Sequence, residues 1–227
     1  MNSEKLKGHI LILITNILFA INMPISKYLL PSHVQPEALT IMRMGSACLL
    51  FWLASLFIKR EKVTIKELLF ICAMCGVGIN QGLFIVGLNR TSPVDASIIA
   101  TGVPIFVMLL AAVILKEPIT KMKALGVLMG CIGGISLILA STHATGQASS
   151  LEGNLMIIVS AFVYSIYLVL SKPLSLRYSA VTMMKWMFLF STLALALFCL
   201  PHVQHVPIFH RETFNMTQLC ALLYLLF

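Results

Sequence analysis

Acidic residues are scarce in this chain of 227 residues. It holds eight carboxylates against 16 lysines and arginines, and only one of the eight is an aspartate, Asp95. Charged residues make up 11% of the sequence, whereas soluble domains carry about 25%. All the glutamates lie in loops or at the ends of apolar stretches. The sequence therefore predicts no intramembrane proton relay of the Asp/Glu type, and a paired-aspartate enzyme is excluded.

Motifs for catalysis and metal binding are also missing. The chain has no phosphate-binding glycine loop that ends in Lys-Ser/Thr, no His-Glu-x-x-His and no Gly-x-Ser-x-Gly. Cys72-x-x-Cys75 has metal-like spacing, but no second pair or nearby histidine completes four ligands. We therefore expect no enzyme activity, no metal and no cofactor. A metal site at His202, His205 and His210 on an outer loop stays open as an alternative to an ordinary solvated loop.

Long apolar stretches dominate what is present. The chain is 59% hydrophobic, with a mean hydropathy of +0.97, and a helix needs about 20 apolar residues to cross a bilayer. The sequence therefore predicts an all-α, polytopic integral membrane protein. An eighth apolar stretch begins near Leu219 and is cut off at Phe227, which we interpret as truncation. The predicted complete spans are 8–30, 38–58, 68–88, 94–115, 122–140, 153–171 and 181–200.

Basic residues concentrate in alternate loops. Eleven lysines and arginines precede the first span or follow the second, fourth and sixth spans, whereas the other connections hold only Arg90 and Arg211. Cytoplasmic loops of membrane proteins carry such an excess, so we expect the N-terminus in the cytoplasm. The net charge of +8 is then a signal of topology and not of nucleic-acid binding.

Two segments near the start of the chain occur again later. Segment 25–29 (ISKYL) followed by 39–43 (LTIMR) is echoed by 170–174 (LSKPL) followed by 181–185 (VTMMK), at offsets of 145 and 142 residues. A unit of five helices that is repeated once must enter the membrane from opposite sides, because five is odd. The sequence thus predicts an inverted repeat, a common architecture of secondary transporters. We expect a first unit at 1–140, an outward loop at 141–152 and an incomplete second unit at 153–227.

The fourth and fifth spans carry the most specific motifs. These are 88–97 (LNRTSPVDAS), Pro104 with Phe106, 115–120 (LKEPIT) and the glycines at positions 126, 130, 133 and 134. The pattern resembles the EamA-type branch of the drug/metabolite transporter superfamily, as does 19–22 (FAIN) with Lys27, although Phe-Ala stands where the family has Trp-Gly. The resemblance implies a ten-helix inverted 5+5 fold, here cut off after seven spans and the start of an eighth. It also implies transport of small metabolites.

Polar and aromatic side chains recur on one face of the first span and on one face of the sixth. At 100° per residue, each set of four falls on a single helix face. Polar groups in the hydrocarbon region need a partner helix or water, so two such stripes predict a wet cavity at the midplane. Hydrogen bonding between neighbouring helices is the alternative. The stripes are Thr15, Phe19, Asn22 and Ser26, and Ser160, Tyr164, Tyr167 and Ser171.

Two more positions extend the predicted path. Asn80 shares a face of the third span with two glycines, and Thr101 shares a face of the fourth span with Pro104, whose ring frees a backbone carbonyl. An interhelical hydrogen bond and an ordinary kink are the alternatives. We predict Pro104 as a gate or kink residue. The predicted substrate-path residues are Asn22, Tyr164, Tyr167, Asn80, Thr15, Ser160 and Thr101.

Two cations and a row of glycines complete the candidates. Arg43 and Lys185 occupy corresponding places in the second and seventh spans, and ionisable residues within membrane segments are functional candidates by default. Snorkelling to the interface is the competing explanation. Gly126, Gly130 and Gly134 form overlapping small-xxx-small repeats, which predict a ridge for close helix packing.

Together these features predict a secondary transporter in the bacterial cytoplasmic (inner) membrane. We expect it to move a small metabolite, such as an amino acid or a related compound, by alternating access. Its expected partners are that substrate and the lipid bilayer, with no nucleic acid, and a homodimer is left open. A membrane receptor, a scaffold and a membrane enzyme are the alternatives.

Overall fold

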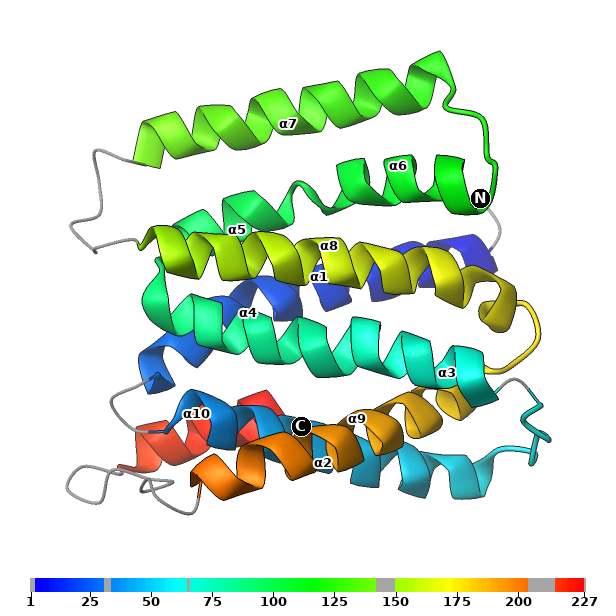
Figure 1. Ribbon diagram of the computed structural model, residues 1–227, viewed down its shortest axis with the longest axis vertical. Coiled ribbons are helices and arrows are strands. Elements are labelled where there is room, and N and C mark those ends of the chain that lie inside the picture. Colours follow the sequence, from blue (N-terminus) through cyan, green and yellow to red (C-terminus); the bar gives the residue numbers. More distant parts are fainter. Residues whose placement is uncertain (1–2, 31–33, 65, 142–149, 204–214, 227) are drawn as a thin grey trace.

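The computed structural model describes residues 3–30, 34–64, 66–141, 150–203 and 215–226, and every secondary-structure element in these ranges is helical. The chain runs back and forth through eight helical segments, some of them interrupted (Figure 1). The all-α prediction is confirmed. Within the described residues, six helices are long and apolar enough to cross a membrane. They are Gly8–Leu29, Pro36–Phe57, Lys66–Arg90, Pro93–Ile114, Leu151–Ser175 and Ala180–Leu197.

The helix bounds agree closely with the predicted spans. Three segments are interrupted. The second ends in a 3-10 turn (Ser55–Phe57), the third is divided by a π-helical turn into α3 and α4, and the fourth is divided into α5 and α6. The elements are α1 (Ser3–Leu29), α2 (Pro36–Ala54), α3 (Lys66–Ala73), the π-helical turn (Met74–Gly78), α4 (Ile79–Arg90), α5 (Pro93–Ala100), α6 (Val103–Ile114), α7 (Lys121–Ser141), α8 (Leu151–Ser175), α9 (Ala180–Val203) and α10 (Met216–Leu226).

Local sequence sets several helix starts. The hydroxyl of Ser92 accepts a hydrogen bond from the backbone N of Asp95 at 3.0 Å, and Pro93 occupies the first turn of α5. Ser150 caps α8 in the same way, with Gly153 N at 3.0 Å. These are the residues that N-caps favour, since their oxygens satisfy amides that have no partner in the first turn.

The fourth span breaks just before Pro104. α5 ends at Ala100 and α6 begins at Val103, with Thr101 and Gly102 between them. Proline has no N–H to bond the carbonyl four residues earlier, and its ring crowds that turn, so the helix opens there. The helix is thus interrupted at the place where the sequence predicts a gate or kink, and the gating role stays a prediction.

Packing is closest in the middle of the molecule. α8 lies along α4, and α2 lies along α9 and runs in the opposite direction (Figure 1). One buried cluster joins α2, α3, α8 and α9 and includes Met44, Cys72, Leu174 and Met187. Another joins the end of α1 to α2, α4 and α10.

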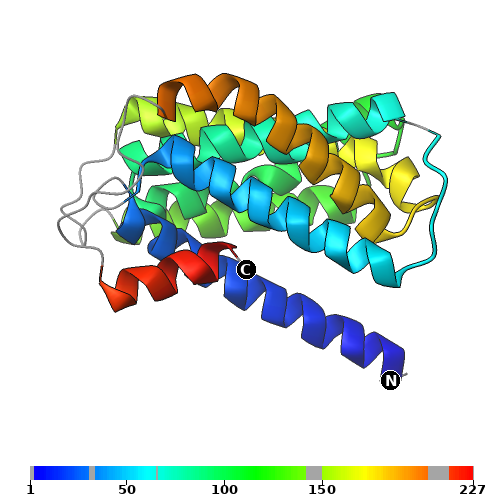
Figure 2. The ribbon, with the colours of Figure 1, turned by 90° about the horizontal axis from the view of Figure 1, so that it is seen from below.

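The outer helices pack more loosely. Side chains along most of α1 are exposed, and Figure 2 shows the N-terminal part of this helix leaning away from the bundle. α10 contacts α1, where the Tyr224 hydroxyl donates to the carbonyl oxygen of Leu18 at 2.8 Å. In the two predicted units α1 and α8 are both first helices, and they run in opposite directions in Figure 1.

Candidate functional site

The polar face of α8 meets the third span. The Nδ2 atom of Asn80 donates to the hydroxyl oxygen of Ser160 at 3.0 Å and lies 3.1 Å from its backbone oxygen. The Ser160 hydroxyl donates to the backbone oxygen of Asn80 at 3.0 Å. Ser160 is 1% exposed and Asn80 is 8% exposed. These two predicted path residues are brought together, and they form the interhelical hydrogen bonds that were the alternative to cavity lining.

Two turns further along α8, Tyr167 presses against the π-helical turn. A Cβ atom added to Gly76 would lie 2.5 Å from Cγ of the Tyr167 ring, so only glycine fits here. The Tyr164 ring lies beside Tyr167, with centroids 5.6 Å apart. The hydroxyl of Ser191 donates to the Ala73 carbonyl at 2.8 Å, just before the turn. A π-helical turn is often found at functional sites, and neither periodicity nor composition signalled this one.

Among the described residues, the hydrogen bonds of the polar stripe on α1 lie within α1 and do not reach α8. Asn22 and Ser26 lie at the better-packed end of α1, where the Ser26 hydroxyl donates to Oδ1 of Asn22 at 3.3 Å. Thr15 donates to the Leu11 carbonyl of its own helix at 2.8 Å, and Phe19 is 66% exposed. In the described residues the polar face of α8 contacts the third span, where Gly76 permits a close approach, and the cavity expected between the two stripes stays a prediction.

Lys27 has a structural role that the sequence did not reveal. Its ammonium donates to the carbonyl oxygens of Leu88 at 2.7 Å and Asn89 at 2.8 Å. These carbonyls lie at the C-terminal end of α4. Carbonyl oxygens there have no N–H partner within the helix, and the negative end of the helix dipole lies at the same place. A lysine near the end of an apolar helix was the only signal available.

Arg43 lies on α2 and is half-buried, and its buried Nη1 atom has no hydrogen-bond partner among the described residues. A buried N–H group without an acceptor costs free energy, so an anion at this position would be favourable. One helical turn on, the hydroxyl of Ser46 donates to the carbonyl oxygen of Leu226 on α10 at 2.9 Å.

Lys185, which corresponds to Arg43 in the second predicted unit, lies in a different setting. Its ammonium sits 5.3 Å from the centroid of the Trp52 ring, a cation–π contact between α9 and α2. The two predicted intramembrane cations thus have unlike environments. Arg43 has a buried nitrogen without a partner among the described residues, whereas Lys185 is stacked on an aromatic ring near the start of its helix.

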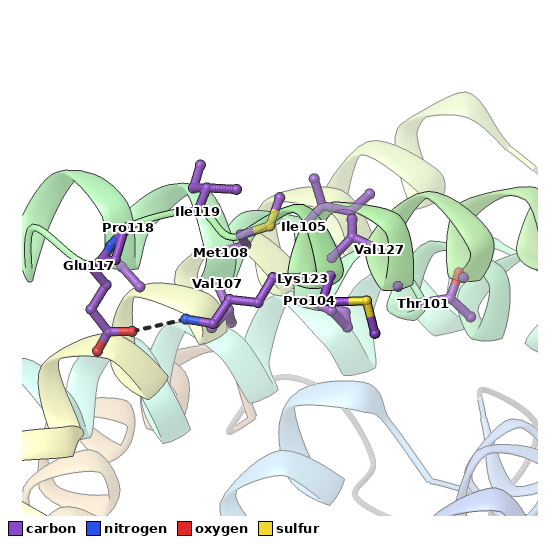
Figure 3. Close-up of a pocket in the computed structure, with 14 residues that line it drawn as sticks. Thr101, Pro104, Ile105, Val107, Met108, Glu117, Pro118, Ile119, Lys123 and Val127 are labelled. Atoms are coloured by element: carbon purple, nitrogen blue, oxygen red, sulfur yellow. Dashed lines mark ion pairs between the residues drawn. The ribbon is translucent and has the colours of Figure 1, made fainter.

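A groove of about 420 Å³ lies between α5–α6 and α7 (Figure 3). Thr101 and Pro104 line one wall, and Gly126 and Gly130 line the other. A Cβ atom on either glycine would meet nothing within 4 Å, so these two do not form the close helix contact predicted for them, because α7 stands apart from α6 along the groove. The surroundings of Gly134 lie outside the described part of the structure. The Thr101 hydroxyl donates to its own helix, at the Ile98 carbonyl.

Ion pairs bracket the two ends of α8. Glu152 pairs with Arg90 at the N-terminal end, and Lys172 pairs with Glu117 at the C-terminal end. Lys123 also approaches Glu117, at 3.5 Å, and closes one end of the groove in Figure 3. The hydrogen bond from Lys172 is the main reason that the pKa of Glu117 lies below its usual value. Each of these pairs joins residues that lie far apart in the sequence, so the sequence alone did not predict them.

Metal binding has no support in the described part of the chain, which holds no group of three or more His, Cys, Asp or Glu side chains suited to an ion. His205 and His210 of the alternative metal site lie outside the described residues, as does the side chain of His202.

Comparison with known proteins gives one family. A profile described as the EamA-like transporter family matches residues 6–140. An uncharacterized transporter of Archaeoglobus fulgidus is 28% identical over 231 residues, which cover 99% of this chain and 75% of that protein. The uncharacterized transporter YyaM of Bacillus subtilis is 27% identical over 174 residues, or 74% of this chain. The match covers only 57% of YyaM, so the chain spans little more than half of that relative's length.

One further relative and one solved structure are also similar to this chain. The Arabidopsis thaliana protein WALLS ARE THIN 1 is 33% identical over 128 residues, or 52% of this chain and 31% of that protein. A solved crystal structure superposes with a TM-score of 0.61 at 20% identity and covers 93% of this chain and 73% of its own. At that identity the likeness supports the fold alone. With six candidate spans, the chain is a multi-pass membrane protein.

Proposed function

This chain belongs to the EamA-like transporter family, and we propose that it acts as a secondary transporter. It moves a small metabolite, such as an amino acid or a related compound, across the bacterial cytoplasmic membrane by alternating access. The N-terminus lies in the cytoplasm, since that side then receives the basic loops.

The arrangement of helix pairs carries this proposal. α8 packs on the third span, and α10 packs on α1. In two units of opposite direction these are equivalent contacts, between the first helix of one unit and the third helix of the other. α2 and α9, the second helices, pack on each other. Such crossed pairing supports a ten-helix inverted repeat, in which rocking of one unit against the other opens a central site to alternate sides.

Arg43 is the proposed anchor for the substrate. A carboxylate accepts two parallel hydrogen bonds from a guanidinium, and this geometry favours arginine where planar anions are bound. The partnerless Nη1 atom of Arg43 provides a donor for such a group. The rest of the solute is proposed to contact the polar residues that the sequence predicts along the substrate path. These are Asn22, Tyr164 and Tyr167, together with Asn80, Ser160, Thr15 and Thr101.

The ion pairs at the ends of α8 are proposed to act as the two gates. Glu152 with Arg90 closes the side of the 141–152 loop, and Lys172 with Glu117 closes the opposite side. Because the two pairs lie at opposite ends of one helix, tilting of α8 can open one while the other holds. The break before Pro104 supplies a hinge for α6, and Glu117 lies in the connection that follows this helix.

Metabolite profiling of cells that overexpress the full-length gene is the test. The pools of small carboxylates inside and outside the cells are compared with those of cells that express the Arg43→Gln variant at equal level. A solute whose distribution shifts only with the wild type supports the proposal and names the substrate. If no pool shifts, or if the variant shifts the same pools equally, the assignment of the substrate to Arg43 is wrong.

A receptor or scaffold remains the competing function, and the same experiment separates it. A receptor changes no metabolite gradient when it is reconstituted alone. Counterflow of the identified solute in proteoliposomes therefore decides between the two, since only a carrier exchanges unlabelled for labelled solute across the vesicle membrane.

A further inference from the structure

A second cavity, of about 570 Å³, lies at the end of the bundle where α2 ends and α9 begins. Four cationic side chains line it, namely Arg60, Lys62, Lys66 and Lys185. They come from three places in the sequence: the loop after α2, the start of α3 and the first turns of α9. The cluster is therefore assembled by the fold and is more than a run of basic residues in one loop.

The loop that carries these cations is fixed to the connection between α8 and α9. The backbone N of Thr64 donates to the hydroxyl oxygen of Tyr178 at 3.1 Å. Glu61 accepts from the backbone N of Ser179 at 3.1 Å and from the Ser179 hydroxyl at 3.3 Å. Glu61 is the one carboxylate among the lining residues, and these bonds engage it at the start of α9. The lining thus keeps an excess of three positive charges.

Tryptophans form the wall on the bundle side. The ammonium of Lys185 lies 5.3 Å from the centroid of Trp52, and that of Lys66 lies 6.0 Å from the centroid of Trp186. The two indoles meet edge to face at 6.0 Å. Tryptophan is enriched where membrane proteins pass from hydrocarbon to headgroups, so this cavity has the composition of a headgroup-level site.

Apolar side chains continue from the cavity along the outside of the bundle. Leu56 lines the cavity and is 71% exposed, and its neighbour Phe57 is 90% exposed. A ligand that combines a phosphate with acyl chains would satisfy both features, because the phosphate neutralises the cations while the chains cover Leu56 and Phe57. A soluble phosphate would satisfy only the first.

We propose that this cavity is a binding site for an anionic phospholipid, with the lipid phosphate held among Arg60, Lys62, Lys66 and Lys185 and the headgroup against the two tryptophans. Assignment of the lipid to the cytoplasmic leaflet rests on the proposed orientation, whereas the binding itself does not.

Native mass spectrometry of the purified full-length protein tests the site. The protein is mixed with phosphatidylglycerol or with phosphatidylcholine of the same acyl chains, and the bound fractions are compared. We expect stable adducts with phosphatidylglycerol and at least about tenfold weaker adducts for the triple variant Arg60→Gln/Lys62→Gln/Lys66→Gln, because each cation near an anionic lipid contributes to binding. The control variant Lys116→Gln/Lys121→Gln/Arg177→Gln removes the same charge from other basic loops and should keep the adducts.

Three results would overturn the proposal. Equal loss in the control variant would mean that overall charge, and not this cavity, attracts lipid. Displacement by inorganic phosphate would indicate a site for a soluble phosphate. Equal adducts for the triple variant and the wild type would show that these cations do not bind lipid.

A second variant distinguishes loss of lipid binding from loss of folding, and the measurement does not depend on transport. If the triple variant aggregates, Lys185→Gln alone should still weaken the adduct, and Lys185→Arg should restore it because the charge over Trp52 is kept. No recovery with arginine would reject the site. The adduct is measured without substrate, so a protein that fails to transport still reports lipid binding.

Discussion

Asn80 and Ser160 hold each other by a reciprocal pair of hydrogen bonds between the third span and α8. The amide of Asn80 donates to the Ser160 hydroxyl, which donates back to the Asn80 backbone oxygen. Both residues are buried, so the pair ties α4 to α8 at the most extensive helix contact in the described structure.

The first prediction concerns this pair. Asn80→Ala and Ser160→Ala should each lower the free energy of unfolding, by about 0.5–1.5 kcal/mol for each hydrogen bond lost. Because the two residues share their bonds, the double variant should cost less than the sum of the single variants. Thermal unfolding in detergent measures the three values. Full additivity would mean that the two side chains act independently.

The second prediction concerns Gly76. Gly76→Ala places a methyl group 2.5 Å from the Tyr167 ring, so it should destabilise the protein by about 1–3 kcal/mol through overpacking. The matched control is Gly82→Ala on α4, where an added Cβ meets nothing within 4 Å. Tyr167→Leu should relieve part of the penalty. Equal melting temperatures for the two alanine variants would contradict the close approach of ring and backbone.

The third prediction concerns Arg43. Arg43→Gln should abolish concentration-dependent uptake of the identified substrate while membrane insertion and yield stay normal, since the change removes a guanidinium whose Nη1 atom has no hydrogen-bond partner among the described residues. Arg177→Gln, an exposed arginine after α8, is the control and should transport normally. Uptake into proteoliposomes gives both rates. A variant with wild-type KM and kcat would place the anion site elsewhere.

The fourth prediction is topological. In a background without cysteine, Leu151→Cys should react with a membrane-impermeant maleimide added to whole cells, and Lys62→Cys should react only after the membrane is opened. Both side chains are exposed, so accessibility in the folded protein does not limit the reaction. The reverse labelling pattern would invert the proposed orientation. The middle of the 141–152 loop, at 142–149, lies outside the described residues.

The fifth prediction concerns pH. The pKa of Glu117 is lowered below 4.5 by its partner Lys172, so the pair stabilises the folded state above pH 4.5 and this stabilisation is lost as the pH falls through the lower folded-state value. Glu117→Gln should therefore reduce the melting temperature at neutral pH, and the difference from the wild type should disappear in acid. Glu67→Gln, another exposed carboxylate, serves as the control. A difference that persists unchanged at low pH would mean that Glu117 acts through packing and not through its charge.

Periodicity along the chain was sufficient to locate the spans. Apolar stretches of membrane length have few other uses, so the helix positions, the break before Pro104 and the family could be predicted from residues alone. Ser160 and Tyr167, which the sequence places on one face of α8, both contact the third span. The helix that covers this face could not be predicted, because helix periodicity shows which side chains share a face but not which helix packs on it.

The sequence by itself determined that this is an all-α, multi-pass membrane protein and roughly where its spans lie, because burial in lipid imposes length, hydropathy and internal backbone bonding on every span. Only the tertiary structure decided that Asn80 pairs with Ser160, that Gly76 receives the Tyr167 ring and that Lys27 caps α4. It also decided that Nη1 of Arg43 has no hydrogen-bond partner among the described residues. The first three relationships join residues 61 to 91 positions apart, and the fourth depends on the absence of a neighbour. They arise from how close two helices can approach, which depends on the side chains of both helices at once.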